Sequence, residues 1–269
     1  MMNQMINKLP RIAFAGDRDI SVRVLDFILA SDLTPLALMV PEKSKASHVD
    51  ELINRCPFLT HDKILFGAAF RSVEGIKLLS ELNLDYIIGI HFPFIFPPEV
   101  LSIPKIGVLN LHPAYLPHNR GWHTPSWAIM DETPYGATLH FMDSGLDTGD
   151  IVHQKNINIS PSDTANTLYQ RLKKLELLVF MEGWAKLLAD TYVRTRQDLS
   201  SGISHKKEEL FNKTIQEIKL NDLVKADDLI KKLRALTTNK IEEAAYYRVG
   251  NKRYRIQVII HEEEIGNKQ

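Results

Sequence analysis

Residues 11–30 read RIAFAGDRDISVRVLDFILA, a short run dominated by apolar residues, then a glycine, then an amphipathic segment. Residues 11–15 predict a buried strand that ends at Gly16, because an apolar run bounded by a turn residue is typical of a strand covered on both faces. Residues 20–30 predict a helix, since their apolar side chains recur every three or four positions. The stretch therefore predicts one strand–helix unit of an α/β fold.

The same alternation of strands and helices continues along the chain. Further strands are predicted at 36–40, 86–90, 107–111, 137–141 and 151–159, and further helices at 47–56, 73–82, 126–131 and 164–189. The segment 91–100 contains three prolines and is expected to be irregular throughout. Buried strands that alternate with helices indicate a Rossmann-like, mostly parallel sheet that is covered by helices on both faces.

The last quarter of the chain has a different pattern. A polar stretch at 194–213 interrupts the alternation, and a helix is predicted at 225–236. Residues 244–260 predict a β-hairpin that turns at Gly250–Asn251. We therefore expect a large domain over 1–195 and a small helix-plus-hairpin subdomain over 196–269.

Composition restricts the environment and the partners of this protein. The 269 residues carry no net charge, which disfavours a nucleic-acid partner, and the basic clusters at 206–207 and 231–234 are expected to be solvated. No apolar run reaches the roughly 18 residues that a membrane span needs. Residues 1–16 lack the features of a signal peptide. A single cysteine, Cys56, suits a reducing compartment, so a cytoplasmic location is expected.

Residues 108–150 read VLNLHPAYLPHNRGWHTPSWAIMDETPYGATLHFMDSGLDTGD and contain the main candidates for chemistry. Asn110 and His112 are two residues apart at the end of a predicted strand, so their side chains leave the same face. Ligands of open α/β sheets bind at the carboxyl ends of strands. An unpartnered buried polar group costs roughly 1–3 kcal/mol, so these two residues require either a function or a structural network.

Asp147 is the third candidate. It lies in the loop 142–150 between Gly145 and Gly149, whose freedom allows unusual backbone conformations. A carboxylate beside a histidine commonly fixes the tautomer of the imidazole and supports its protonated form. Asn110, His112 and Asp147 therefore form a candidate catalytic set.

Several other interpretations of these residues remain open. The polar groups could cap the strand, and the acidic loop could bind calcium, although its spacing does not match an EF-hand. A metal hydrolase would combine Asp147 with histidines from the set His91, His112, His118 and His123. A regulatory module would bind its ligand without turnover. A nicotinamide-cofactor enzyme is disfavoured, because only Gly16 stands where the dinucleotide motif needs three glycines.

A set of short motifs resembles the 10-formyltetrahydrofolate-dependent formyltransferase family. The motifs are Phe14-Ala15-Gly16, Ile95-Phe96-Pro97, Asn110-Leu111-His112-Pro113, Leu116-Pro117, Arg120-Gly121, Gly136-Ala137-Thr138 with His140, Asp143, and Asp147-Thr148-Gly149. The resemblance covers about residues 11–190 and implies an N-formyltransferase. It implies that Asn110 and His112 stabilise the oxyanion formed when an amine attacks the formyl carbon. It also implies that Asp147 holds His112 and helps to move a proton from the amine.

The same resemblance implies a folate site and no metal. The formyl donor, 10-formyltetrahydrofolate, would place its pterin between the loops 92–101 and 142–146. The expected contacts are Phe92, Phe94, Ile95, Phe96, Leu101, Met142, Asp143, Gly145 and Leu146. Apolar side chains and irregular backbone in these loops suit a flat ring with polar edges.

The carboxyl-terminal third decides which amine is formylated. It is too short for the barrel of methionyl-tRNA formyltransferases, which remain the alternative, and is similar to that of the sugar-nucleotide N-formyltransferases. The resemblance implies an acceptor that is a nucleotide-linked (dTDP-type) amino-dideoxy sugar of O-antigen or lipopolysaccharide synthesis. The expected acceptor contacts are Arg120, Trp122, His123, Lys206, Lys207, Phe211 and Tyr247. An aromatic hairpin edge further predicts a homodimer through the carboxyl-terminal part.

Overall fold

The computed structural model describes residues 9–45 and 47–265. Residues 1–8, for which no signal peptide was expected, residue 46, and the end of the predicted subdomain at 266–269 lie outside the described residues. The chain forms two compact units. The first unit contains residues up to His112 together with Thr138–Gln154 and Glu176–Gln197, and the second contains Pro113–Ala137, Lys155–Leu175 and the residues from Asp198 onward. The division at 195/196 therefore stays a prediction.

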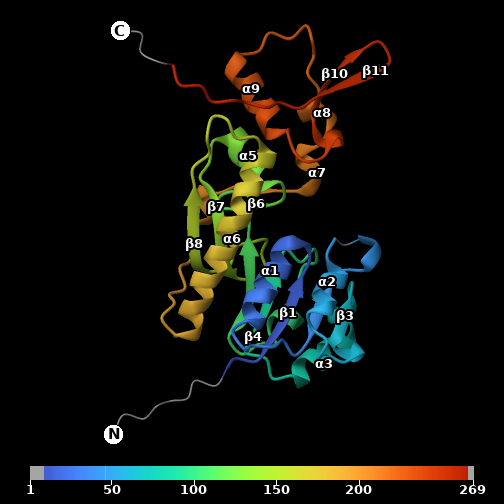
Figure 1. The fold of residues 1–269 in the computed structure, drawn as a ribbon, viewed down its shortest axis with the longest axis vertical. Coiled ribbons are helices and arrows are strands. Elements are labelled where there is room, and N and C mark those ends of the chain that lie inside the picture. The colour runs from blue at the N-terminus through green and yellow to red at the C-terminus, as the bar shows by residue number, and fades with distance from the viewer. Residues whose placement is uncertain (1–8, 46, 266–269) are drawn as a thin grey trace. The chain divides into compact units, whose positions relative to one another are not determined.

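A seven-stranded sheet has the order β3-β2-β1-β4-β5-β7-β8 (Figure 1). Its strands are β1 (Ile12–Gly16), β2 (Leu38–Val40), β3 (Ile64–Phe66), β4 (Tyr86–Ile90), β5 (Gly107–His112), β7 (Tyr135–Phe141) and β8 (Ile151–Ile157). The pairs from β3 to β5 are parallel, whereas β7 runs antiparallel to β5. The predicted α/β fold with a mostly parallel sheet is thereby confirmed.

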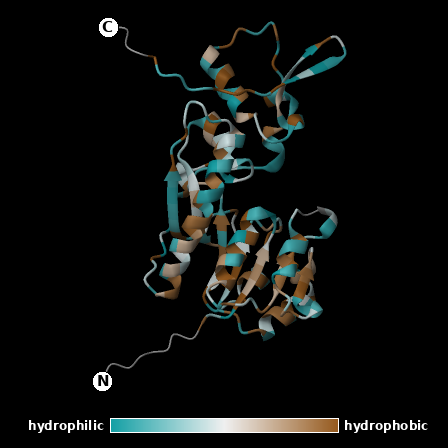
Figure 2. Ribbon diagram, in the orientation of Figure 1, coloured by the Kyte–Doolittle hydropathy of each residue, from teal (hydrophilic) through white to brown (hydrophobic). Residues whose placement is uncertain are grey.

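Helices and apolar side chains cover both faces of the sheet in the first unit. The helices are α1 (Arg18–Leu29), α2 (Val49–Asn54), α3 (Val73–Glu81), α4 (Pro98–Leu101) and the second half of α6 (Ala165–Leu188). On one face, Ala13, Ile87 and Val108 belong to a buried cluster with residues of α3 and α4. On the other face, Tyr86 packs edge-on against Trp184 of α6 at 5.4 Å. Figure 2 shows the central strands as hydrophobic and the edge strand β8 as hydrophilic.

Two predictions of local structure were wrong. The sequence analysis predicted no strand at β3, which has only three residues and thus no readable periodicity. It also predicted no regular structure across 91–100, but α4 begins at Pro98 within that segment. Proline is tolerated in the first turn of a helix because the amide groups there have no partner inside the helix.

The second unit holds short elements, including the predicted helix and hairpin. They are α5 (Thr124–Asp131), α7 (Lys207–Leu210), α8 (Lys213–Gln216), α9 (Ala226–Ala235), β6 (Arg120–Gly121), β9 (Ser204–His205), β10 (Ala245–Val249) and β11 (Lys252–Ile256). Single 3₁₀ turns across both units lie at Lys43–Lys45, His61–Lys63, Ala69–Arg71, Leu199–Ser201 and Ile241–Glu243. Gly250 has φ = 56°, which fits the predicted hairpin turn. The predicted helix-plus-hairpin architecture is confirmed.

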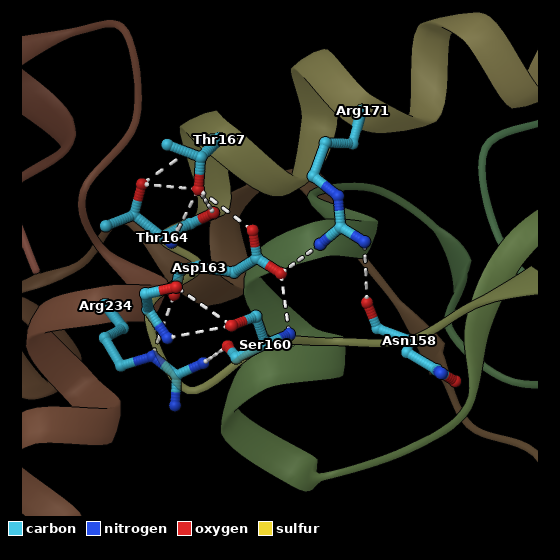
Figure 3. Close-up of polar contacts among 8 residues, drawn as sticks. Asn158, Ser160, Asp163, Thr164, Thr167, Arg171 and Arg234 are labelled. Carbon is cyan, nitrogen blue, oxygen red and sulfur yellow. Dashed lines mark hydrogen bonds and ion pairs between the residues drawn. The ribbon is translucent and has the colours of Figure 1, made fainter. Parts of the chain in front are cut away.

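The start of α6 and the end of α9 meet in a polar network around Asp163 (Figure 3). The Asp163 carboxylate accepts hydrogen bonds from the Ser160 amide at 2.7 Å and from the Arg171 guanidinium. Arg234 donates to the backbone oxygen atoms of Asp163 at 2.8 Å and Ser160 at 2.7 Å. The cluster 231–234 was expected to be solvated, and this is wrong for Arg234, because its donors satisfy carbonyl groups at a turn.

No helix in the described part of the chain has the length and apolar character that crossing a bilayer requires.

Candidate active site

Strand β5 ends at the first two candidate residues. Asn110 and His112 follow Val108 on the same face of the strand, above the buried cluster that α3 and α4 cover. The His112 side chain is 6% exposed. Both side chains contact one carboxylate. This agrees with the prediction that they leave the same face at the carboxyl end of the strand.

That carboxylate belongs to Asp147. Its Oδ1 accepts a hydrogen bond from Asn110 Nδ2 at 3.2 Å, and its Oδ2 lies 3.5 Å from His112 Nδ1. The Asp147 side chain is 10% exposed, so water screens these contacts only weakly. The structure thus brings together all three residues of the predicted catalytic set.

His140 on β7 is a fourth member of this cluster. It lies opposite Asn110 in the antiparallel register, and its Nε2 is 3.1 Å from Asn110 Nδ2. Its Nδ1 is 2.7 Å from the carbonyl oxygen of Phe141, which can only accept, so Nδ1 carries the proton and Nε2 accepts from Asn110. Burial lowers the pKa of His140 below its ordinary value, although the Asp147 carboxylate acts in the opposite direction. His140 is therefore held as a neutral acceptor.

The amide group of Asn110 is oriented by these contacts. Its Nδ2 has two hydrogens, and they point to Asp147 and to His140. The opposite assignment of the amide would place its oxygen against the Asp147 carboxylate, which is unfavourable. Donation from Asn110 to any ligand requires that one of these two hydrogen bonds be exchanged.

A glutamine fixes the loop that carries Asp147. Gln197 Nε2 donates to the backbone oxygen of Asp147 at 3.0 Å and to that of Gly149 at 2.6 Å. No pattern in the sequence pointed to Gln197, because it stands alone in the polar stretch 194–213. The residue with the unusual backbone is Asp147 itself, at φ = 54°. Gly149 instead permits close approach, because a Cβ there would lie 2.0 Å from the Phe141 oxygen.

The residues predicted to hold folate form an aromatic cluster and two exposed tips. The Phe70 ring lies 5.4 Å from Phe92, 6.0 Å from Phe94 and 5.2 Å from Phe96. Leu101 and Met142 pack against the same core, so both predicted loops rest on it. Phe96 is a core residue, whereas Ile95 is 73% and Leu146 44% exposed. Ile95 and Leu146 are thus the large hydrophobic side chains of these two loops that are most exposed to solvent.

The remaining predicted folate contacts organise the second loop. The Asp143 carboxylate accepts from the Gly145 amide at 3.0 Å and from the Thr148 hydroxyl at 2.6 Å. In this arrangement Asp143 and Gly145 support the turn that leads to Asp147.

Four of the predicted acceptor contacts meet in the second unit, and we call them the Trp122 cluster. Its members are Trp122, His123, Lys207 and Phe211. The Lys207 ammonium lies 5.1 Å from the centre of the Trp122 ring, and the His123 ring lies 4.4 Å from the Phe211 ring. His123 Nε2 donates to the Lys207 carbonyl oxygen at 2.9 Å. Trp122 is 37% exposed, so the cluster presents a cation and an aromatic face to solvent.

The other three predicted acceptor contacts lie differently. Arg120 is 8% exposed and donates through Nη2 to the Gly202 carbonyl oxygen at 3.1 Å, while its buried Nε and Nη1 have no hydrogen-bond partner among the described residues. The Lys206 amide caps α7 by donating to Glu209 at 2.9 Å. Tyr247 stacks on Tyr254 of the hairpin at 5.3 Å.

The metal alternative requires several His, Cys, Asp or Glu side chains grouped around one point. Among residues 9–45 and 47–265, no three His, Cys, Asp or Glu side chains are grouped so that they could hold a metal ion. His91, one of the proposed ligands, is instead paired with Glu176 at 2.6 Å.

A Rossmann-like sheet with an amide, an imidazole and a carboxylate at the carboxyl end of a strand places this chain among the α/β proteins that bind a ligand at that edge of the sheet. Residues 33–183 match the family described as Formyl transferase, and residues 211–262 match the N-formyltransferase dimerization C-terminal domain. The chain belongs to the formyl transferase family, as the sequence resemblance predicted.

Solved structures share this fold over nearly the whole chain. A sugar N-formyltransferase from Shewanella sp FDAARGOS_354 is 22% identical and superposes with a TM-score of 0.78, covering 96% of this chain and 100% of its own. A 4-N formyltransferase from Francisella tularensis is 22% identical with a TM-score of 0.78, covering 94% and 99%. An N-formyltransferase from Helicobacter canadensis, crystallised with folinic acid and dTDP-3-aminofucose, is 21% identical with a TM-score of 0.65, covering 88% and 86%. These likenesses establish the fold.

Curated relatives match over a shorter stretch. The methionyl-tRNA formyltransferase of Geobacter metallireducens is 36% identical over 129 residues, which are 48% of this chain and 42% of the relative. That of Clostridioides difficile is 33% identical over 176 residues, which are 61% of this chain and 55% of the relative. The chain therefore spans about half the length of the curated relatives it matches.

Proposed function

We propose that this protein transfers a formyl group from 10-formyltetrahydrofolate to the amino group of a nucleotide-linked amino-dideoxy sugar. The observation that carries the proposal is the cluster of Asn110, His112, His140 and Asp147 at the carboxyl end of β5, in a chain of the formyl transferase family. Such a cluster offers what acyl transfer to an amine needs, namely donors for an oxyanion and a group that accepts a proton.

In this reaction the nitrogen of a neutral amine attacks the formyl carbon, and the carbonyl oxygen becomes an oxyanion. Asn110 donates to that oxyanion by exchanging one of its two hydrogen bonds, and His112 assists through the ring nitrogen that is not turned toward Asp147. The proton released by the amine passes to the His112–Asp147 pair. When the oxyanion collapses and the bond between the formyl carbon and N10 breaks, the pair returns that proton to N10, which leaves as the secondary amine of tetrahydrofolate. A single oxyanion donor of this kind contributes roughly 3–4 kcal/mol to catalysis.

His140 and Gln197 are positioning residues in this proposal. His140 aligns the Asn110 amide through Nε2, and Gln197 aligns the Asp147 loop through two backbone oxygens. Holding these groups in place limits the reorganisation during the reaction to the exchange of one Asn110 hydrogen bond, and small reorganisation is the main source of their catalytic effect.

For the formyl donor, we propose that the pterin covers the exposed side chains of Ile95 and Leu146. The loops around these residues rest on the Phe70 cluster, which gives them a rigid base. The co-crystallised folinic acid of the Helicobacter canadensis relative supports a folate as the donor.

For the acceptor, we propose the Trp122 cluster as the nucleotide site. The Lys207 ammonium suits a diphosphate, and the Trp122 face suits a base or sugar ring. Two nitrogens of the buried Arg120, Nε and Nη1, have no hydrogen-bond partner within residues 9–45 and 47–265, and they suit a further anionic or carbonyl oxygen. The dTDP-3-aminofucose of the Helicobacter canadensis relative supports this class of acceptor, and we place the product in surface polysaccharide synthesis of the O-antigen type.

The match of residues 211–262 to a dimerization domain supports a homodimer, which sedimentation equilibrium would test. A monomeric mass at micromolar protein concentration, reached in a salt-dependent manner, would contradict the homodimer.

Methionyl-tRNA formylation is the second candidate, and the sequence identity to the Geobacter metallireducens relative favours it. The test is a panel of amino-sugar nucleotides and of aminoacylated initiator tRNA, each with 10-formyltetrahydrofolate, in which release of tetrahydrofolate is followed. We expect turnover with at least one dTDP-amino sugar and none with the tRNA. Turnover with the tRNA alone would overturn the proposal.

A further inference from the structure

Outside the described cluster, the first unit holds a second buried pair of a histidine and a carboxyl group. His91 Nε2 lies 2.6 Å from Glu176 Oε1, and the two side chains are 6% and 0% exposed. Glu176 Oε2 is also buried and has no hydrogen-bond partner among the described residues. Burying such groups is costly, and well-packed apolar residues are often as stable in their place. Stability alone therefore does not explain why the pair is there.

His91 occupies the point where the chain leaves β4. In the parallel register of β4 and β5, Ile90 lies opposite Leu111, and His91 is the first residue after β4. His91 has φ = 50°, a left-handed conformation that is uncommon for a residue with a side chain. The preceding carbonyl, that of Ile90, accepts from the Ser21 hydroxyl at 2.6 Å and from the Asp17 amide at 3.3 Å. The hydrogen bonds to the Ile90 carbonyl and the His91–Glu176 contact together fix the direction in which the chain leaves β4.

Glu176 contacts His91 from the face of the sheet that does not carry Asn110 and His112. It lies on α6, which packs against Tyr86 through Trp184, whereas Asn110 and His112 lie above the face that α3 and α4 cover. The segment that starts at His91 then crosses to the latter face, because Phe92, Phe94 and Phe96 pack there against Phe70. The His91–Glu176 pair is therefore placed to set the path of this segment.

We infer that His91 and Glu176 are a positioning pair for folate binding, acting through the loop 92–97. This inference rests on the proposed function, in which Ile95 at the tip of that loop covers the pterin. The pair touches neither the folate nor the reacting atoms. Its loss lets the loop start in a different direction and moves Ile95, while Asn110, His112, His140 and Asp147 keep their mutual contacts.

The chain offers a matched control. His153 Nε2 lies 2.6 Å from Glu182 Oε2, so a second pair of the same chemistry joins a strand to α6. The two side chains are 15% and 36% exposed, and His153 lies on β8, the edge strand, which is separated from β4 by β5 and β7 in the sheet order. If an effect arises only from a disturbance of α6, or from the loss of any His–Glu contact, it should appear whichever of the two pairs is changed.

The experiment compares Glu176→Gln with Glu182→Gln in the full chain. We measure thermal unfolding, the affinity for 5-formyltetrahydrofolate by titration calorimetry, and KM and kcat with 10-formyltetrahydrofolate. We expect Glu176→Gln to weaken folate binding and raise the folate KM about tenfold, equivalent to ~1.4 kcal/mol, with kcat nearly unchanged. Glu182→Gln keeps the wild-type values.

A second variant, His91→Asn, guards against a folding defect, because asparagine tolerates the left-handed conformation. Of these two variants, those that fold are compared with Glu182→Gln, and an equal folate affinity would overturn the inference. A loss confined to kcat or to thermal stability would also overturn it. Failure of both variants to fold would overturn it too, since the pair would then be structural. If the wild-type protein itself binds no folate, the proposed function fails instead, which is a distinguishable outcome.

Discussion

The cluster around Asp147 and the Trp122 cluster differ in how completely the protein satisfies their polar groups. In the first, both hydrogens of the Asn110 amide have acceptors, and the side chains of His112, His140 and Asp147 are at most 10% exposed. In the second, Trp122 is 37% exposed and Lys207 makes only a cation–π contact with it at 5.1 Å. The comparison indicates that the polar groups of the proposed reacting site are already paired within the protein, whereas the proposed acceptor site presents groups whose contacts a ligand would complete.

The largest expected effect is in the first cluster. Asp147→Asn replaces a carboxylate oxygen by an amide nitrogen that faces the donors of Asn110 or His112. We expect kcat to fall about 10³-fold, within the range for loss of a proton-transfer group. Tetrahydrofolate release measures the rate, and circular dichroism verifies folding.

The control on the same loop is Asp143→Asn, which keeps an acceptor for Gly145 and Thr148. We expect it to retain kcat within several-fold. If Asp147→Asn also retained kcat, the Asp147 cluster would not be the reacting site, and the proposed division of roles between the two clusters would be wrong.

A smaller effect is expected in the Trp122 cluster. Trp122→Ala and Lys207→Ala each remove a group that the ligand would contact, so the acceptor KM should rise about tenfold with little change in kcat, as for loss of uniform binding. Folate affinity should not change. Lys206→Ala is the matched control, because Lys206 caps α7 through its backbone amide. An equal rise in KM for Lys206→Ala would show that net charge, and not the position of Lys207, matters.

The buried state of His140 predicts a dependence of stability on pH. Its pKa is lowered from about 6.5, so at a pH below 6.5 the unfolded chain binds a proton that the native state does not. The stabilisation is complete above 6.5 and is lost as the pH falls, by up to about 1.4 kcal/mol per pH unit for one proton.

Burial lowers the pKa of His123 and His205 in the same direction. Denaturant unfolding between pH 7 and pH 5 tests the effect, and His140→Gln should reduce the slope. An unchanged slope would mean that His140 is protonated in the native state, contrary to its assigned role as an acceptor.

The smallest effect concerns Cys56, which lies in neither cluster. Burial raises the pKa of its thiol to about 11, so little thiolate forms at neutral pH. We expect no reaction of the native protein with iodoacetamide at pH 7 and full reaction in denaturant, by mass spectrometry. Rapid alkylation accompanied by loss of activity would place a thiol in the reacting site.

The sequence analysis was most accurate where structure is local. The predicted strand 86–90 matches β4, and the predicted helix 164–189 matches α6 to within a residue at each end. Each has an apolar pattern that its own residues display. It was weakest at β3 and α4, where the elements are too short to show a period. The members of the Trp122 cluster were predicted as acceptor contacts, but their contacts with one another were not predicted, because these link distant positions such as His123 and Lys207, which are 84 residues apart.

By itself, the sequence determined the class of fold, the family, and the placement of Asn110 and His112 on one face at the end of a strand. Strand periodicity is a property of neighbouring residues, so it can be read without a structure. Only the tertiary structure decided that His140 accepts from Asn110, that Gln197 holds the Asp147 loop, and that Glu176 pairs with His91. These contacts depend on strand register and on helix packing over long separations, and no local pattern in the chain records them.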